Sequence, residues 1–467
     1  MTTHETPEDL SLLPATRRAL RHRLARAQSE SRVPSLVAGV TRDGEVIWEG
    51  ALSALEGVEA DGDTQYRIGS ISKTFTAVLV MRLRDEGLLE LTDPLEKHLP
   101  GTGAGRATVA DLLSHTGGLA AEAPGEWWER SPGTLRPELA DVLGEEPHRH
   151  PVGRVHHYSN PGYTLLGALV EEVRGEPWEK VLRAEVLEPL GLTRTSYAPQ
   201  APYAQGWAVH PWADTLLPEP AHDLGRMAPA GQLWSTTRDL LRFAAFLVQG
   251  DDAVLGAASV REMRTPAAPS LPGAQESAYG LGTQVLSVGG GITLTGHMGS
   301  LPGYLAALLT REDEGLAAVV LANTTSGPLV GSLAAELIGI VAEAEPSMPR
   351  LWRPMAEADP QVLELVGAWY WGVTPYGLHY GADGGVELRP LKGIGRAARF
   401  VPAGDGTWRG LDGYFLGETL RPVRDAEGTV THLDLGSFVF TREPYAPDSV
   451  VPGGVDAKGW RGAGELG

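Results

Sequence analysis

A serine and a lysine three positions apart, Ser70 and Lys73, are the residues whose types and spacing most directly suggest chemistry. They begin an apolar stretch, residues 70–83, that predicts a helix, and one helical turn brings the amine to the hydroxyl. The free N–H groups at the start of a helix also favour negative charge on an attacked carbonyl oxygen. The pattern therefore predicts a serine nucleophile with a lysine as its proton acceptor.

Lys73 accepts a proton near neutral pH only if its pKa falls well below about 10.4, which burial or a neighbouring cation produces. We therefore expect Lys73 to be at least partly buried. The chain has five lysines, and the S-x-x-K spacing occurs once. The alternative is a surface lysine beside a serine that caps a helix.

The stretch Tyr158-Ser159-Asn160, just before a predicted helix at residues 163–173, is a second candidate. A loop there presents a phenol and an amide from one piece of backbone. A tyrosine whose pKa is lowered by cations can shuttle a proton between nucleophile and leaving group, while Asn160 holds a substrate carbonyl and the lysine. The chain has only two asparagines. Taken alone, a turn before Pro161 is the simpler interpretation.

The stretch His297-Met298-Gly299-Ser300 is a third candidate, in a loop that we expect between strands near Leu281 and Tyr304. Such a loop at a sheet edge lines a cleft. A single histidine in a loop is more often structural than catalytic.

Within this stretch the residue types suggest separate roles. Gly299 would let a substrate backbone approach closely. The Ser300 N–H would join the Ser70 N–H as an oxyanion donor. His297 would be a polar or cationic partner for Tyr158 or for a substrate carboxylate.

These residues must be positioned by the surrounding secondary structure, for which the sequence predicts strands at both ends of the region and helices between them. This order predicts an α/β (α+β) fold in which one antiparallel sheet, flanked by helices, is interrupted by a helical subdomain. The predicted helices are 14–28, 70–83, 108–113, 163–173, 236–248 and 330–342, and the predicted strands are 35–49 with a turn at Asp43-Gly44, 281–286, 304–310 and 316–321.

A polar stretch with prolines at residues 343–354 predicts a linker. After it, the sequence predicts short strands, at residues 386–388, 413–420 and 433–440. We expect four parts: a catalytic domain at 1–345, a linker at 346–362, a small β-barrel at 363–446 and a tail at 447–467.

Composition excludes several functional classes. The chain has no cysteine, so thiol nucleophiles, disulfides and cysteine-ligated metal sites are excluded. The net charge of −20 argues against a nucleic-acid partner. No window is apolar enough to span a membrane, and Met1 to Glu5 lack the layout of a secretory signal, so we expect a cytoplasmic protein without a membrane partner.

Two further groups of residues have competing interpretations. His148, His150, His156 and His157 invite a zinc site, but their spacing lacks a helical i, i+4 pair, so we expect no metal and no cofactor. Four tryptophans are candidates for the wall of an apolar acyl pocket, although aromatic residues are more often core; Trp234 is the best of them as a substrate-binding residue, and the others are Trp127, Trp128 and Trp207.

In the order S-x-x-K, Y-x-N and H-x-G, the three motifs resemble the serine β-lactamase and penicillin-binding protein superfamily, and most closely its class C β-lactamase-like branch. That branch includes D-aminopeptidases, D-peptidases, carboxylesterases and stand-alone penicillin-binding-protein-type thioesterases that cyclise nonribosomal peptides. The resemblance covers about residues 30 to 340 and includes the connecting stretches TVADLLSHTGGL, EPLGLTRT, LWSTTRDLL and YGLG. The sequence VGAW at residues 366–369 also looks like the start of a lipocalin-type barrel.

The resemblance implies that Ser70 is the nucleophile, that Lys73 and Tyr158 transfer protons, and that Asn160 contacts substrate and Lys73. His297 stands where class C β-lactamases carry a lysine, which puts efficient penicillin hydrolysis in doubt.

Three functions remain open from sequence. The first is a hydrolase of small esters, amides or D-configured peptides that passes the acyl group from Ser70 to water. The second is a cyclase that takes a peptidyl group from a carrier-protein thioester and releases it to the peptide's own amine. The third is a non-catalytic acyl-binding sensor, against which the complete proton-transfer set argues.

Overall fold

A computed structural model describes residues 12–136, 138–268, 277–349, 351–393 and 395–450. Met1 to Glu5, on which the expectation about secretion rests, and residues 451–467 of the predicted tail lie outside this range. The chain divides after Ser347 into two compact units, which are described separately. No helix among the described residues has the length and apolar character that a membrane crossing needs.

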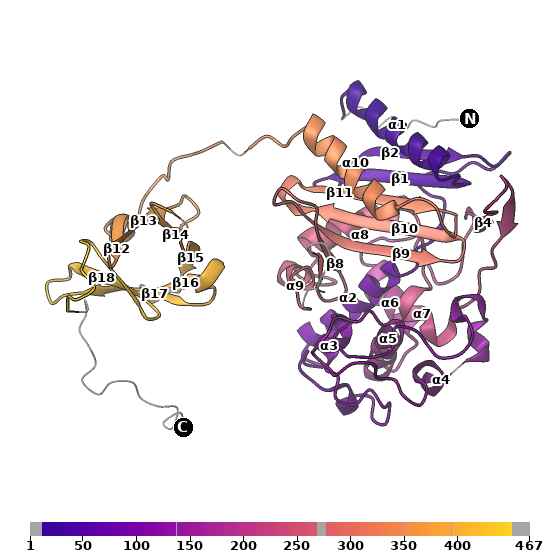
Figure 1. Ribbon diagram of the computed structural model, residues 1–467, viewed down its shortest axis with the longest axis horizontal. Helices are drawn as coiled ribbons and strands as arrows, with labels where there is room; N and C mark the ends of the chain where they lie inside the picture. Colours follow the sequence, from indigo (N-terminus) through magenta and orange to yellow (C-terminus); the bar gives the residue numbers. More distant parts are fainter. Residues whose placement is uncertain (1–11, 137, 269–276, 350, 394, 451–467) are drawn as a thin grey trace. The chain divides into compact units, whose positions relative to one another are not determined.

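The first unit is built on a seven-stranded antiparallel sheet with the strand order β2-β1-β11-β10-β9-β8-β7 (Figure 1). The interior strand β11 is buried along its whole length, which explains its continuous apolar sequence. β1 and β2 form a hairpin whose turn, Asp43-Gly44, has positive φ at both residues. The strands are β1 (Ser35–Arg42), β2 (Glu45–Ser53), β7 (Ser277–Tyr279), β8 (Gln284–Ser287), β9 (Thr293–Leu301), β10 (Tyr304–Arg311) and β11 (Leu316–Ala322).

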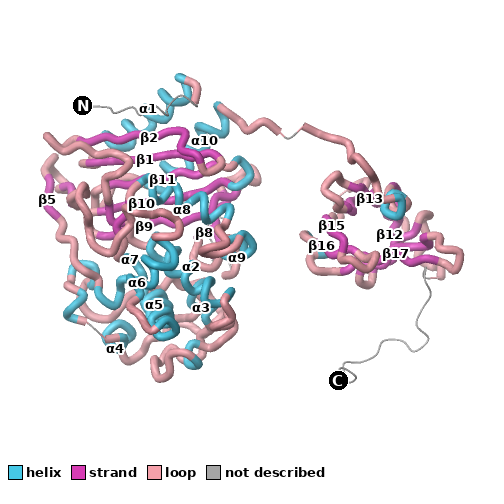
Figure 2. Tube along the Cα trace, turned by 180° about the vertical axis from the view of Figure 1, so that it is seen from behind, coloured by secondary structure: helices cyan, strands magenta, loops and turns pink. Residues whose placement is uncertain are grey.

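Helices cover both faces of this sheet (Figures 1 and 2). α1 (Pro14–Glu30) and α10 (Val330–Ala344) bury their apolar faces against one side. α8 (Thr237–Gln249) packs on the other side, where a larger apolar core joins the sheet to a helical subdomain. The subdomain contains α2 (Ile71–Asp85), α3 (Val109–Leu113), α4 (Leu139–Leu143), α5 (Asn160–Arg174), α6 (Trp178–Leu182) and α7 (Ala228–Gly231), and α9 (Ala257–Met263) follows α8.

The predicted fold class is confirmed, but the strands near the third motif were misplaced. Residues 281–286 are not one strand, because a turn at Gly282, with φ +84°, precedes β8. His297 to Ser300 lie inside β9 rather than in a loop. β9 contains two glycines and is buried at successive positions, so it lacks the apolar–polar alternation that marks a strand in sequence.

The second unit is a closed, eight-stranded antiparallel barrel, which confirms the predicted β-barrel. Its interior is filled by side chains such as Trp369, Phe400 and Leu433, so it is a packed core. A short helix, α11 (Pro360–Leu363), precedes the barrel strands β12 (Gly367–Trp371), β13 (Thr374–Tyr380), β14 (Val386–Pro390), β15 (Ala398–Pro402), β16 (Trp408–Gly410), β17 (Thr419–Arg424), β18 (Val430–Leu435) and β19 (Phe438–Thr441).

Two of the predicted barrel strands were wrong in extent. Residues 413–420 begin with a single 3₁₀ turn, Gly413–Phe415, and only their end belongs to β17. Residues 433–440 contain the end of β18, a turn at Gly436 and the start of β19. Short strands joined by very short turns are not separable by hydrophobic pattern alone.

Candidate active site

Ser70 immediately precedes α2, and Lys73 lies in the first turn of that helix. The Lys73 side chain is fully buried. Its Nζ donates to Ser70 Oγ at 3.1 Å and to the main-chain oxygen of Ala230 at 2.7 Å. The apolar face of α2 is packed in the core of the first unit, so the helix holds the amine and the hydroxyl side by side.

Burial lowers the pKa of Lys73 to about 7, against the opposing negative charges of Glu122 and Glu129. No ion pair to Lys73 occurs among the described residues; the amine lies 4.9 Å from the ring centroid of Tyr158 and 5.8 Å from that of Tyr163. With a pKa near 7, a large share of the amine is neutral at physiological pH and can take a proton from Ser70.

The Tyr158 phenol interacts with the side chain of Ser70, and this interaction favours a lower pKa for the phenol. Burial nevertheless raises the pKa of Tyr158, and the interaction with Ser70 opposes this only in part. The expectation that cations lower this pKa is therefore wrong. Tyr158 remains a neutral phenol at physiological pH, which gives it both a proton to donate and a lone pair to accept one.

Asn160 begins α5 and has a different partner from the one expected. Its Nδ2 donates to both carboxylate oxygens of Glu122, at 2.9 Å each, whereas the amine of Lys73 is bonded to Ser70 and Ala230. The proposed contact between Asn160 and Lys73 is thus absent from this structure. Ser159 caps the helix by accepting the Gly162 N–H at 3.0 Å, which fixes where α5 starts.

His297 is fully buried in β9, where its Nδ1 lies 2.6 Å from the carbonyl oxygen of Met298 and its Nε2 lies 2.9 Å from the hydroxyl of Tyr279. Because a carbonyl only accepts, Nδ1 carries the ring proton and Nε2 accepts from Tyr279. Burial and then the charge of Lys73 lower the pKa of His297 to about 3. The ring is neutral, so of the two expected forms, polar or cationic, His297 takes the polar one, and its hydrogen-bond partner is Tyr279 rather than Tyr158.

Gly299 and Gly69 bring β9 against the start of α2. A Cβ on Gly299 would overlap the carbonyl oxygen of Ile68 and lie 3.1 Å from the Ser70 nitrogen. A Cβ on Gly69 would lie 2.7 Å from the Ser300 nitrogen. The space beside Gly299 and Gly69 is therefore filled by main-chain atoms of the protein itself. This corrects the expectation that Gly299 makes room for substrate.

The same close approach places two main-chain nitrogens beside the nucleophile, those of Ser70 and Ser300. In the part of the chain that the structure describes, the Ser70 N–H donates no hydrogen bond to another main-chain group. Ser300 itself is exposed. An oxygen anion bound between these two groups would have donors from two different elements.

Trp234 does not line the site. It is 2% exposed, and its ring packs against Tyr304 at 5.3 Å and Tyr203 at 5.7 Å between centroids. The expectation that Trp234 binds substrate is therefore wrong. The large apolar side chain of Trp234 packs in the core, where the guanidinium carbon of Arg67 lies 5.9 Å from the centroid of its ring.

Trp234 instead helps to place the nucleophile through the main chain. The two-residue strand β6 (Trp234–Ser235) pairs with β3 (Tyr66–Arg67), which leads directly to Ser70. The Leu233 nitrogen donates to the hydroxyl of Ser72 in α2 at 3.1 Å. The start of α2 is thus held from two sides, by β6 and by β9.

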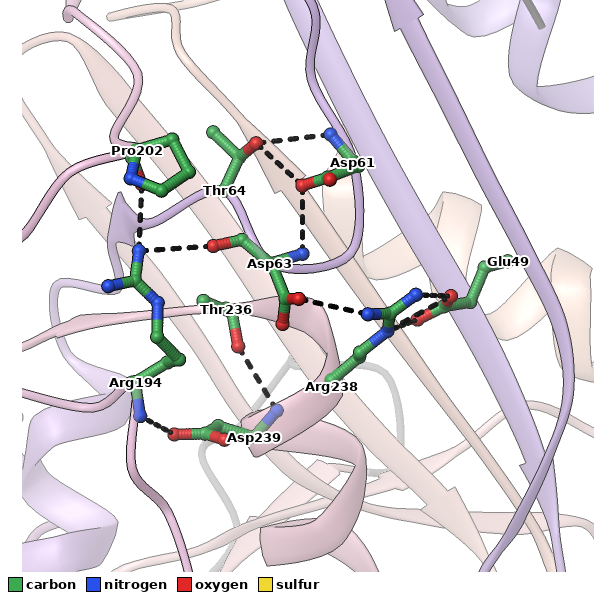
Figure 3. Close-up of polar contacts among 9 residues, drawn as sticks. All are labelled: Glu49, Asp61, Asp63, Thr64, Arg194, Pro202, Thr236, Arg238 and Asp239. Atoms are coloured by element: carbon green, nitrogen blue, oxygen red, sulfur yellow. Dashed lines mark hydrogen bonds and ion pairs between the residues drawn. The ribbon is translucent and has the colours of Figure 1, made fainter. Parts of the chain in front are cut away.

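A polar network braces the loop that precedes β3 (Figure 3). Arg194 Nη2 donates to the main-chain oxygens of Asp63, at 3.2 Å, and Pro202, at 3.0 Å. Arg238 bridges the Asp63 carboxylate, at 3.0 Å, and that of Glu49 in β2, at 2.9 Å. These charge-assisted bonds tie the loop to the sheet and limit its movement.

Three residues around the site received no role from sequence: His115, Glu122 and Tyr279. His115 belongs to the stretch TVADLLSHTGGL and Tyr279 to YGLG, both part of the family resemblance, so a signal for them existed. Glu122 stands in a loop with no local pattern. Its contact with Asn160 depends on the tertiary fold.

The four histidines considered as zinc ligands lie around the loop before α5. His150 and His157 have ring centroids 4.7 Å apart, and His157 Nδ1 is bonded to the carbonyl oxygen of Leu119 at 2.8 Å. Within the described ranges, no group of three or more potential ligand side chains is close enough to hold a metal ion.

Two family models match the chain. One, described as Beta-lactamase, matches residues 17–343, and the other, a domain of unknown function numbered 7586, matches residues 358–442. Penicillin-binding protein 4 of Amycolatopsis lactamdurans is 30% identical over 363 residues, which are 73% of this chain and 94% of that protein. The chain spans only 54% of beta-lactamase-like protein 2 of Dictyostelium discoideum, to which it is 26% identical over 60% of its own length.

Solved structures match the first unit alone or both units. A D-stereospecific amidohydrolase from a Streptomyces species has a TM-score of 0.58 and 26% identity over 71% of this chain and 99% of its own. A structure of SurE with D-Leu has a TM-score of 0.55 and 27% identity over 92% of this chain and 100% of its own.

Proposed function

Because the chain belongs to the beta-lactamase family, we propose that it is a serine acyl-transfer enzyme that works through an acyl group on Ser70. The observation that carries this proposal is the fully buried Lys73, whose amine lies 3.1 Å from the Ser70 hydroxyl and has a pKa of about 7. A binding protein would gain nothing from burying an amine beside a hydroxyl without a carboxylate to pair with it, because that burial costs stability.

In the proposed reaction, Ser70 Oγ attacks the acyl carbonyl while neutral Lys73 takes the hydroxyl proton. The main-chain N–H groups of Ser70 and Ser300 bind the carbonyl oxygen as it becomes negative. The bond to the leaving group then breaks, and Tyr158 gives the leaving group its proton and regains one from Lys73. Water or an amine reverses these steps, so that the acyl group leaves Ser70 and the proton set is restored.

We propose a D-configured acyl donor, such as a small amide, ester or peptide. Two matched structures above 25% identity support this choice: one is titled a D-stereospecific amidohydrolase, and the other contains D-Leu. The negative charges of Glu122 and Glu129 act on Lys73, and carboxylates this close to the nucleophile favour a donor with a free ammonium. A penicillin carries a carboxylate and meets a neutral His297 there, which disfavours it.

The second candidate is transfer of a peptidyl group from a thioester, carried on a protein or a small thiol, to the peptide's own amine. The observation that favours it is the apolar surroundings of Lys73, which lies against the rings of Tyr158 and Tyr163 and is closed off from solvent. A water-poor pocket protects an acyl-serine from hydrolysis and leaves time for an amine to attack.

The test is an intact-mass assay on Ser70 with matched donors: D-phenylalanine and L-phenylalanine nitrophenyl esters and amides, a linear peptidyl thioester, and a penicillin. We expect an adduct and turnover with the D-donors and no adduct in Ser70→Ala. Product masses separate the two candidates, since cyclic and hydrolysed peptides differ by one water. An adduct that never turns over indicates a sensor, and activity that survives in Ser70→Ala removes Ser70 from the mechanism.

A further inference from the structure

His115 contacts three successive residues of the Tyr158 loop in three different ways. Its main-chain oxygen accepts the N–H of His157 at 2.8 Å. Its ring lies 4.2 Å from the ring of Tyr158, centroid to centroid, with the planes tilted by 34°. Its Nδ1 accepts the N–H of Ser159 at 3.0 Å. The residue before the phenol, the phenol itself and the residue after it are all held by one side chain and its backbone.

The conformation of His115 is itself fixed by the fold. It follows α3 with φ +60°, a left-handed conformation that a non-glycine residue rarely adopts. The side chain is 2% exposed and is also surrounded by the rings of Tyr163, at 5.0 Å, and Tyr279, at 4.7 Å. Such a conformation persists only where the surrounding structure enforces it, so the packing around His115 fixes its position.

The hydrogen bonds define the protonation state of the ring. Because the Ser159 amide can only donate, Nδ1 is unprotonated and the ring proton is on Nε2. Nε2 is buried and has no hydrogen-bond partner among the described residues. Burial, followed by the positive charge of Lys73, keeps the pKa of His115 well below its usual value, so the ring is neutral at physiological pH.

We propose that His115 is the positioning residue of Tyr158. Through its contacts with residues 157 to 159, it holds the phenol close to Ser70 during proton transfer. The inference rests on the proposed function and extends it to a residue that does not touch substrate. Tyr158 has rotatable side-chain bonds and stands in a loop, so its hydroxyl needs an external support to stay within hydrogen-bond reach of the nucleophile. Both the tilted ring contact and the bond to the Ser159 N–H supply that support.

Two variants separate these contacts. His115→Asn keeps an acceptor two bonds from Cβ and tolerates a positive φ, but it removes the ring. His115→Phe keeps a ring against Tyr158, but it removes the acceptor and leaves the Ser159 N–H unpaired. His148→Asn is the matched control, because it makes the same change at an exposed histidine near the same loop.

The experiment measures acylation of Ser70 by a nitrophenyl ester, as kcat/KM and as adduct mass, in two backgrounds: the native chain and Tyr158→Phe. In the native background we expect His115→Asn to lower kcat/KM by about 10-fold to 100-fold, which is part of what a positioned proton donor supplies. In the Tyr158→Phe background we expect less than about a twofold further loss, because the phenol that His115 positions is already gone.

Equal losses in both backgrounds, with the Ser70 adduct intact, contradict the role of His115, and so does full activity of His115→Asn. Absence of any adduct in the native protein contradicts the proposed function instead. Thermal unfolding identifies a variant that fails to fold. If His115→Phe fails to fold, the comparison of His115→Asn in the native and Tyr158→Phe backgrounds still tests the proposal.

Discussion

The amine of Lys73 donates to the main-chain oxygen of Ala230 at 2.7 Å, a shorter contact than its 3.1 Å contact with Ser70. Ala230 is in α7, so a second helix anchors the amine. A neutral amine has two N–H groups and one lone pair. With one N–H on Ala230, the lone pair is free to face the Ser70 hydroxyl, which is the arrangement that proton removal requires.

The rate of acylation should therefore follow the titration of Lys73. Burial places its pKa near 7, and the neutral form is the active one, so kcat/KM for an uncharged ester should rise between pH 5 and pH 8 and level off above that range. Lys73→Ala should lose as much activity as Ser70→Ala, and the double variant should lose no more, because the two groups act as one unit. A pH profile that is flat from pH 5 to pH 8 would show that another base is at work.

Removing the charge of Glu122 should shift this profile. The Glu122 carboxylate raises the pKa of Lys73 against the effect of burial, so in Glu122→Gln the rise in kcat/KM should move to lower pH. Glu122 is exposed, so we expect a shift of only a few tenths of a pH unit that shrinks as salt is added. Glu126→Gln in the same exposed loop is the control and should leave the midpoint in place. A shift to higher pH would contradict the assignment.

Burial of Lys73 should also lower the free energy of unfolding of the native protein. Its pKa falls from 10.5 to about 7 on folding, so between these values the unfolded chain binds more protons and stability increases with pH. Lys73→Met should be more stable than the native chain at pH 7, and its advantage should fall by about 2 to 3 kcal/mol between pH 7 and pH 9. Urea unfolding at both pH values measures this. Lys180→Met, at an exposed lysine, should show no such trend, and an advantage of Lys73→Met that is independent of pH would disprove the account.

The sequence predicted the Ser70–Lys73 pair because one helical turn fixes their distance, whatever surrounds the helix. It failed for Asn160, whose amide pairs with Glu122, 38 residues earlier in the chain. Nothing in the local sequence of either residue encodes that contact. The two residues meet only because the loop after Leu119 lies beside the start of α5, as the bond from the Asn160 nitrogen to the Ala121 carbonyl shows.

The errors at the third motif have another physical origin. The Gly299 position was interpreted as room for substrate, since sequence alone does not reveal which backbone approaches a glycine. For a related reason, sequence alone leaves the charge of His297 open and gives the wrong direction for the pKa of Tyr158. Burial decides both pKa values, and the depth of burial follows from tertiary packing rather than from neighbouring residues.

Gly299→Ala tests whether the contact between β9 and the start of α2 forms the site. The added methyl group would overlap the Ile68 carbonyl oxygen, so the two segments must separate. We expect a loss of about 1 to 3 kcal/mol in the free energy of unfolding, as for other overpacked positions. Destabilisation alone lowers the acylation rate only by reducing the fraction of folded protein. We expect a larger fall in rate than that, because the Ser300 N–H moves away from Ser70.

Gly339→Ala is the matched control, since Gly339 lies in α10 with no atom within 4 Å of the added methyl group. Alanine in a helix is more favourable than glycine by roughly 0.5 to 1 kcal/mol, so this variant should gain stability and keep full activity. Urea unfolding and nitrophenyl ester kinetics on the two variants give both quantities. If Gly299→Ala folds and acylates like the native chain, β9 does not supply the second oxyanion donor, because a backbone displaced from Ser70 cannot hold the same oxygen.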